Sequence, residues 1–240
     1  MSAAALRALH VPGAPLVLPN AWDAGSAKLV AAAGFPVVAT TSSGVAEALG
    51  FEDGELAPAD QVLGVVAAIA RAVDVPVTAD MESGYGLAPA ELAAALAEAG
   101  AVGLNYEDTD HARYPALRPV AEQAERIAAV KAAADLVLNA RIDVHIRGLT
   151  TEEGLERARA YLDAGADCVY PIGITDPATI ERYVQLGGAV NVLLSPDQLP
   201  VEALAGLGVA RISLGHYLHA AAMDAARERL VRLSLRDTRS

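Results

Sequence analysis

The sequence predicts a (β/α)8 barrel that forms one domain over residues 1–240. Short apolar runs rich in Val, Ile and Leu alternate with Ala-rich stretches of helical periodicity, and eight such pairs can be counted. Strands that are apolar on both faces and separated by helices belong to a parallel sheet, because a crossover helix returns the chain in the same direction. An open, doubly wound sheet is the alternative, but the first strand is followed by P-N-A-W-D-A-G-S-A-K, without a glycine-rich phosphate loop.

The elements are assigned in order along the chain. The predicted strands cover 15–18, 37–41, 76–80, 102–107, 136–141, 168–171, 189–194 and 210–214. The predicted helices between and after them cover 23–34, 58–74, 88–100, 120–134, 151–164, 176–187, 199–207 and 216–233. Three helices end in similar phrases that lead into a strand, A-A-A-G-F, A-E-A-G-A and L-D-A-G-A-D, and glycine suits the left-handed position that closes a helix.

Charge and composition limit the classes of partner. The chain has 18 Lys and Arg against 30 Asp and Glu, a net charge of -12, which disfavours nucleic acid and anionic membranes. An anionic substrate would therefore need a cation or arginines in the site. The chain has no apolar run long enough for a membrane span, and its first ten residues lack the apolar core of a signal peptide, so we expect a cytoplasmic protein. The single cysteine, Cys168, excludes an intrachain disulfide and is expected to be a buried small hydrophobe rather than a nucleophile.

Acidic side chains gather where the third and fourth strands end. The run V-T-A-D-M-E-S-G-Y-G places Asp80 and Glu82 there, Glu107 ends the next strand, and Asp53 lies on the loop after the second strand. The C-terminal ends of barrel strands meet at one mouth, so these oxygens form a set that suits Mg²⁺ or Mn²⁺. Because no His accompanies them at ligand spacing, zinc is disfavoured. A single acid of this kind could equally cap a helix; the set favours a metal.

Other strand ends offer groups for an anion. Arg141 ends the fifth strand, and it either pairs with neighbouring acids as structure or binds a substrate carboxylate; both interpretations stay open. The turn T-T-S-S-G-V at 40–45 offers consecutive backbone N–H groups as an anion nest. The candidate substrate-binding residues are Trp22, Ser42, Ser43, Gly44, Asp80, Arg141 and Asn191.

Four segments resemble motifs of the isocitrate lyase and phosphoenolpyruvate mutase superfamily. T-S-S-G-V-A-E-A-L-G-F-E-D-G resembles its S-G-x-G-V-A-x-x-L-G-x-x-D, and A-D-M-E-S-G-Y-G resembles its D-A-D-x-G-[YF]-G. G-L-N-Y-E-D resembles its G-x-x-[IL]-E-D, and N-A-R-I-D-V-H-I-R-G resembles its A-R-T-D-A-x-x-x-G. The resemblance covers nearly the whole chain. It implies a barrel whose last helix is exchanged between subunits, a homo-oligomer (dimer or tetramer), a Mg²⁺ site, and a bond made or broken next to an enolpyruvate-type oxyanion.

The resemblance also implies roles for single residues. Asp80 is expected to contact the metal, and Asp53, Glu82 and Glu107 to hold its waters. Arg141 is expected to support the enolate. Ser42, Ser43 and Gly44 are expected to bind the carboxylate of the substrate.

Two segments depart from the superfamily's branches. The lyase branch carries K-[KR]-C-G-H in the loop after the fourth strand, where this chain has D-T-D-H-A-R-Y-P. The mutase branch carries a His at the end of the sixth strand, where this chain has Pro171 and Ile172. His111 or Arg113, in the loop 108–119, could supply the proton in place of the thiol. The alternative is that these side chains are solvated and have no catalytic role.

The predicted function is a Mg²⁺-dependent, lyase-like enzyme for a small 2-oxo or 2-hydroxy carboxylate, with Arg141, Glu107 and His111 as catalytic residues. Alternatives are a decarboxylase or hydrolase of oxaloacetate-like acids and a barrel that binds 2-oxo acids without turnover. Release of CO₂ or of a carbonyl compound would distinguish the enzymes.

Overall fold

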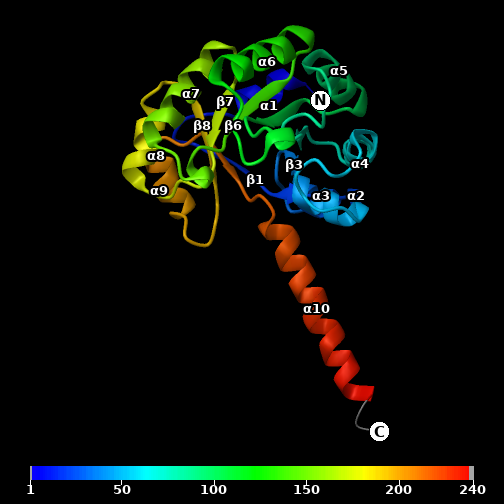
Figure 1. Cartoon of the computed structure of the whole chain (residues 1–240). Helices are drawn as coiled ribbons and strands as arrows, with labels where there is room; N and C mark the ends of the chain where they lie inside the picture. Colours follow the sequence, from blue (N-terminus) through cyan, green and yellow to red (C-terminus); the bar gives the residue numbers. More distant parts are fainter. Residues whose placement is uncertain (1, 238–240) are drawn as a thin grey trace.

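Parallel strands form a closed barrel in the computed structural model, which describes residues 2–237 (Figure 1). The sheet order β1-β9-β8-β7-β6-β5-β4-β3-β2 follows the chain around the ring, with every pair parallel. This confirms the predicted (β/α)8 barrel. The strands are β1 (Leu16–Leu18), β2 (Asn20–Ala21), β3 (Val38–Thr40), β4 (Val77–Asp80), β5 (Gly103–Glu107), β6 (Val137–Ile142), β7 (Cys168–Pro171), β8 (Ala189–Leu193) and β9 (Arg211–Ser213).

The first predicted strand, 15–18, corresponds to β1, and Pro19 separates it from β2, a short strand that was not predicted. β1 pairs with β9 and β2 pairs with β3, so the two strands together close the ring. Proline has no N–H to give to a ladder. The side chain of Asn20 bridges the break: its Nδ2 donates to the carbonyl of Thr40 at 2.7 Å, and its Oδ1 accepts from the N–H of Leu214 at 3.0 Å.

The predicted helices are present, most of them within one to three residues of their expected bounds. Two further helices were not predicted, α1 and α3, and the segment 40–45, expected to be a turn, runs into the start of α3. Leu6 of α1 is fully buried against Leu16, Leu18 and Val137 and fills the bottom of the barrel. The helices are α1 (Ala3–Ala8), α2 (Ala24–Ala32), α3 (Ser42–Leu49), α4 (Ala59–Ala72), α5 (Pro89–Ala99), α6 (Val120–Ala133), α7 (Thr151–Asp163), α8 (Pro177–Val184), α9 (Val201–Gly206) and α10 (Tyr217–Asp237).

The last helix, α10, points away from the barrel (Figure 1). Residues 221–234 are all exposed, among them the apolar side chains of Met223, Leu230 and Val231. Exchange of this helix between subunits, which the resemblance implied, stays a prediction because it involves a second chain. Over residues 2–237, none of the helices combines the length and hydropathy that crossing a membrane requires.

Candidate active site

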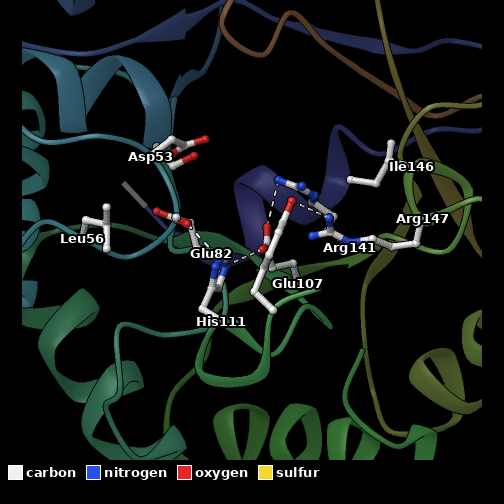
Figure 2. Close-up of a pocket in the computed structure, with 11 residues that line it drawn as sticks. Asp53, Leu56, Glu82, Glu107, His111, Arg141, Ile146 and Arg147 are labelled. Atoms are coloured by element: carbon white, nitrogen blue, oxygen red, sulfur yellow. Dashed lines mark hydrogen bonds and ion pairs between the residues drawn. The ribbon is translucent and has the colours of Figure 1, made fainter. Parts of the chain in front are cut away.

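Two adjoining cavities occupy the mouth of the barrel at the C-terminal strand ends. The outer cavity measures about 410 Å³ and the inner cavity about 160 Å³, and Ser42, Asp53 and Arg141 line both. The outer cavity, drawn in Figure 2, is lined by Ser42, Asp53, Gly54, Leu56, Glu82, Glu107, His111, Tyr114, Arg141, Ile146 and Arg147. The inner cavity is lined by polar groups that include Asn20, Ser43, Asp80, Asn105, Ser213 and His216.

Strand alternation explains why β4 delivers two carboxylates. β4 ends at Asp80, but its backbone pairing with β5 continues: the N–H of Met81 donates to the carbonyl of Asn105, and the N–H of Glu107 donates to the carbonyl of Glu82. The alternation of side chains therefore extends to Glu82, so Asp80 and Glu82 both line the mouth while Met81, between them, is fully buried in the outer core. The chain then turns, and Glu82 and Tyr85 both adopt left-handed backbone conformations, with φ of +46° and +52°. Such strain in non-glycine residues is typical of functional sites. The phenol of Tyr85 donates to Oε1 of Glu82 at 2.6 Å and fixes the acid's orientation.

The imidazole of His111 lies between the acids that follow β4 and end β5. The 3₁₀ turn His111–Arg113 brings Nε2 of His111 to 2.8 Å from Oε1 of Glu107 and 3.4 Å from Oε2 of Glu82 (Figure 2). The prediction that no His accompanies these acids is therefore wrong. Ligand spacing along the chain does not reveal His111, because it reaches the acids from the loop after β5.

These residues fit a divalent cation. One ligand atom each from Glu82, Glu107 and His111 lies within 4.8 Å of the others. Among the described residues, Oδ1 of Asp80 is buried without a hydrogen-bond partner, so a carboxylate oxygen with unmet acceptor capacity also faces this region. Oxygen-rich donor sets suit Mg²⁺ and Mn²⁺, and the imidazole adds a nitrogen that Mn²⁺ accepts more readily than Mg²⁺.

The pKa values of these acids are raised, because the carboxyl groups are buried and lie close to one another. Burial, together with the neighbouring acids Asp53, Glu107 and Asp80, raises the pKa of Glu82 to about 8, although the hydrogen bond from Tyr85 opposes the shift. Burial likewise raises the pKa of Glu107 to about 7, although Arg141 opposes the shift. Burial also raises the pKa of Asp80. A bound divalent cation would favour the ionised form of all three.

Arg141 is held by acids on both sides. Its Nη1 lies 2.8 Å from Oε2 of Glu107, and its Nε donates to Oδ1 of Asp143 at 2.6 Å. Asp143 is fully buried and also accepts from the hydroxyl of Thr109 at 2.6 Å. The structural role proposed for Arg141 is therefore present, and the same guanidinium lines both cavities, so it also lies where a substrate carboxylate would bind.

The segment predicted as a nest is the first turn of α3. The first N–H groups of a helix have no partner within the helix and attract anions. Here the N–H of Ser42 donates to Oδ2 of Asp80 at 3.3 Å, and Ser42 and Ser43 line the inner cavity. The backbone N–H of Asp80 in turn donates to the hydroxyl of Thr40 at 2.8 Å, which locks the strand end to the start of the helix.

Three predicted substrate-binding residues do not line either cavity. Gly44 packs where a Cβ would lie 2.8 Å from Cγ2 of Thr41 and 3.1 Å from Cβ of Trp22, so packing, rather than approach to a ligand, accounts for the glycine. The ring of Trp22 meets that of His219 edge-on at 4.8 Å. Asn191 is fully buried and hydrogen-bonds Ser213. A role for these three residues in binding substrate stays a prediction.

Several residues of the site were missed from the sequence. Tyr85 and Glu55 organise the loop after β4, since Glu55 accepts from the N–H of Tyr85 at 2.6 Å and from the hydroxyl of Ser83 at 2.9 Å. Tyr114 and Arg147 line the outer cavity. For Tyr85, Tyr114 and Arg147 the available signal was their position on loops that directly follow strands at the mouth, whereas Glu55 lies on the loop between α3 and α4. Cys168 is fully buried in β7, and burial raises its pKa to about 12.

Comparisons with known proteins give the same family along nearly the whole chain. A family model described as phosphoenolpyruvate phosphomutase matches residues 6–234. An uncharacterised protein of Mycobacterium tuberculosis is 34% identical over 221 residues, 91% of this chain and 84% of its own. The phosphoenolpyruvate phosphomutase of Streptomyces hygroscopicus is 32% identical, over 92% of this chain and 76% of its own. The 2-methylisocitrate lyase of Salmonella typhimurium is 31% identical, over 76% and 66%.

Solved structures have the same fold. A phosphonomutase candidate from Burkholderia cenocepacia J2315 is 41% identical with a TM-score of 0.88, over 95% of this chain and 98% of its own. A phosphonopyruvate hydrolase in complex with oxalate and Mg²⁺ is 28% identical, with a TM-score of 0.85 over 98% and 87%. An oxaloacetate acetylhydrolase bound to its product oxalate is 28% identical, with a TM-score of 0.87 over 97% and 86%.

Proposed function

The chain belongs to the phosphoenolpyruvate phosphomutase family, and we propose that it is a Mg²⁺-dependent, lyase-like enzyme. Its substrate is a small 2-oxo or 2-hydroxy carboxylate, and the reaction makes or breaks a bond next to an enolate. The observation that carries the proposal is the convergence of Asp80, Glu82, Glu107 and Arg141, from three neighbouring strand ends, around one mouth.

The acids would bind the cation, and the cation would bind the oxygens of the substrate. Asp80 is the direct ligand in this proposal, with Glu82, Glu107 and Asp53 around it. The bound metal would supply positive charge to the oxo and carboxylate oxygens, which offsets the net charge of -12 on the chain.

The chain's own groups would orient the substrate and stabilise the developing charge. The N–H groups at the start of α3, from Ser42 and Ser43, would bind the carboxylate; that both residues line the inner cavity supports this role. Arg141 lies at the junction of the two cavities, where its guanidinium would stabilise the enolate oxygen. His111 would deliver or accept the proton at the enolate carbon. Burial lowers its pKa, but the hydrogen bond to Glu107 and the neighbouring acids raise that pKa more, so the net shift is upward.

A specific observation favours a second candidate, a decarboxylase or hydrolase of oxaloacetate-like acids. The only cysteine of the chain is fully buried on β7, so the loop after β5 offers an imidazole and no thiol. Decarboxylation and hydrolysis need the same stabilised enolate and no thiol acid. The similar oxaloacetate acetylhydrolase and phosphonopyruvate hydrolase support this candidate.

A substrate screen tests both candidates. The protein is incubated with a panel of 2-oxo and 2-hydroxy carboxylates, with Mg²⁺ or with a chelator, and substrate depletion and products are followed by mass spectrometry. A carbonyl product such as glyoxylate supports the lyase, and CO₂ or a hydrolysed acid supports the second candidate. Tight Mg²⁺-dependent binding without turnover would instead indicate a 2-oxo acid-binding barrel, and no binding at all would contradict the proposal.

The remaining expectations are also proposals. We propose that the protein acts in the cytoplasm as a homo-oligomer, a dimer or tetramer. The exposed apolar side chains of α10, such as Leu230 and Val231, support an oligomer, because exposed apolar surface on an otherwise polar helix is typical of an interface. Light scattering of the purified protein tests this proposal.

A further inference from the structure

The outer cavity has one cation that the proposed chemistry does not use. Arg147 lies on the 3₁₀ turn His145–Arg147, directly after the strand end that carries Arg141. Its side chain lines the outer cavity but not the inner one (Figure 2). It therefore lies beside the wider part of the mouth, whereas Asp80 and Ser43 line the inner cavity.

The partners of Arg147 within the chain are neutral. Its Nη1 donates to the hydroxyl of Tyr114 at 2.9 Å and its Nη2 to the hydroxyl of Thr109 at 3.1 Å, and its guanidinium stacks on the ring of Tyr114 at 4.5 Å. A guanidinium has five N–H groups, so three remain, including a buried Nε with no partner among the described residues. Over residues 2–237, no carboxylate oxygen lies within 4.0 Å of it, whereas Arg141 contacts two carboxylates.

A partly buried arginine without a carboxylate is suited to an anion from outside the chain. Removing a cation from water is costly unless an anion meets it, and the planar fork of arginine matches a carboxylate in particular. Its position is held by Tyr114 and Thr109, so little conformational entropy would be lost on binding.

Three exposed apolar side chains also line the outer cavity, beside its charged groups. Leu56, Tyr114 and Ile146 are 59%, 65% and 46% exposed, and all three line it. Leu56 and Ile146 lie on opposite sides in Figure 2. Exposed large apolar side chains that share one cavity are typical of a binding surface for apolar groups. The outer cavity, about 410 Å³ against about 160 Å³ for the inner one, also offers more room than a two-carbon oxo acid head needs.

We propose that Arg147 determines specificity by binding a second carboxylate at the far end of the substrate. The substrate class is then an extended 2-oxo or 2-hydroxy dicarboxylate: its oxo acid head lies in the inner cavity and its apolar middle lies between Leu56 and Ile146. This inference rests on the proposed function, because it takes the oxo acid head to bind at Ser42, Asp80 and Arg141.

A matched pair of ligands tests the inference. Isothermal calorimetry with Mg²⁺ present measures the affinities of 2-oxoadipate and 2-oxohexanoate, which have six carbons each and differ by one terminal carboxylate. The unaltered protein should bind 2-oxoadipate about 10 to 100 times more tightly, the range expected for a charge-assisted hydrogen-bonded pair. Arg147→Gln should remove that preference and change the affinity for 2-oxohexanoate less than about twofold.

Two further variants test whether Arg147 itself binds the second carboxylate, rather than acting through its charge alone or by fixing its loop. Arg113→Gln removes the same charge from a side chain that is 79% exposed and does not line the outer cavity, so it should leave the preference for 2-oxoadipate intact. Arg147→Lys keeps the charge but loses the fork and the stacking, and should retain part of the preference. If Arg147 only fixed the loop that carries Tyr114, Arg147→Gln would weaken both ligands equally.

Binding of oxalate distinguishes failure of this inference from failure of the proposed function. If oxalate and both 2-oxo acids fail to bind with Mg²⁺, the proposed function is wrong and this inference is wrong with it. If oxalate binds and the unaltered protein shows no preference for 2-oxoadipate, or if Arg147→Gln keeps that preference, only this inference is overturned.

Discussion

The floor and the rim of the mouth are built by different means. On the floor, Asp80, Glu107 and Arg141 end neighbouring strands, and their directions follow from the strand alternation and the register Glu107↔Arg141. On the rim, His111, Tyr114 and Arg147 lie on loops: a hydrogen bond between loops joins Arg147 to Tyr114, and a hydrogen bond to Glu107 joins His111 to the floor. The floor is therefore fixed by the barrel itself, while the rim can change its chemistry without disturbing the sheet. In the proposed function the floor holds the cation and the enolate, while the rim supplies the proton from His111 and selects the substrate through Arg147.

The largest effect is expected when an acid of the floor is removed. Asp80→Ala should reduce Mg²⁺ binding and turnover below detection, since Asp80 is the direct ligand in the proposal. The barrel should stay folded, because burial raises the pKa of Asp80 and an alanine has no buried charge to solvate. Calorimetry with Mg²⁺ and thermal unfolding by circular dichroism measure both. Asp163→Ala, an exposed acid at the end of α7, is the control. An unchanged Mg²⁺ affinity would contradict the role of the floor.

Sequence patterns predicted the floor much better than the rim. The end of each strand could be found from its apolar run, and the acids at 80, 82 and 107 follow from it. The position of His111 could not, because it depends on how the loop after β5 folds back, and that fold rests on contacts far along the chain. The same limit explains α3: its first residues, S-S-G, are typical of turns, and packing of Gly44 against Trp22 favours the helix.

The second prediction exchanges a rim residue that acts in the proposed chemistry. Without a thiol, the proton at the enolate carbon comes from His111 or from water, so His111→Gln should lower turnover of the best substrate by ~10²–10⁴. Mg²⁺ and oxalate affinities should stay within about threefold, because the proposal assigns the metal to Asp80 and the acids around it and assigns His111 the proton. Isocitrate and 2-methylisocitrate should be poor substrates for both proteins. Full turnover of His111→Gln would show that the proton comes from elsewhere.

The third prediction concerns the anchor between floor and rim. Asp108, the first residue of the rim loop, is fully buried and accepts from Nη1 of Arg157 at 3.0 Å and from the hydroxyl of Tyr161 at 2.9 Å. Arg157→Met leaves this buried carboxylate without its cation, which should lower the free energy of unfolding by about 3–5 kcal/mol. Urea denaturation measures it. Arg159→Met, an exposed position on the same helix, should change stability by less than about 0.5 kcal/mol. Equal effects of the two variants would show that the rim is not anchored there.

The smallest expected effect is the pH dependence of Mg²⁺ affinity, and it distinguishes the acids of the mouth, among them Glu82 beside the floor, from acids outside it. Burial raises the pKa of Glu82 to about 8 and that of Glu107 to about 7, so both bind protons near neutral pH that a cation would displace. Mg²⁺ affinity should therefore rise with pH, by about 10 to 100 times between pH 6 and pH 8, and level off above pH 8.

The direction in which stability changes with pH follows from the protons that the folded protein binds. In the metal-free protein a raised carboxyl pKa means that the folded state holds more protons than the unfolded state from about pH 4.5 to pH 8, so stability without Mg²⁺ should fall as pH rises through that window. Added Mg²⁺ should reverse the trend. Calorimetry in two buffers of different ionisation enthalpy counts the protons released at pH 7. Glu82→Gln should lower that number by up to one, whereas Glu122→Gln, an exposed acid that pairs with Arg118 beside the rim loop, should leave it unchanged. A Mg²⁺ affinity that is flat from pH 6 to pH 8 would mean that the floor acids are already ionised, and would remove the electrostatic reason for placing the cation among them.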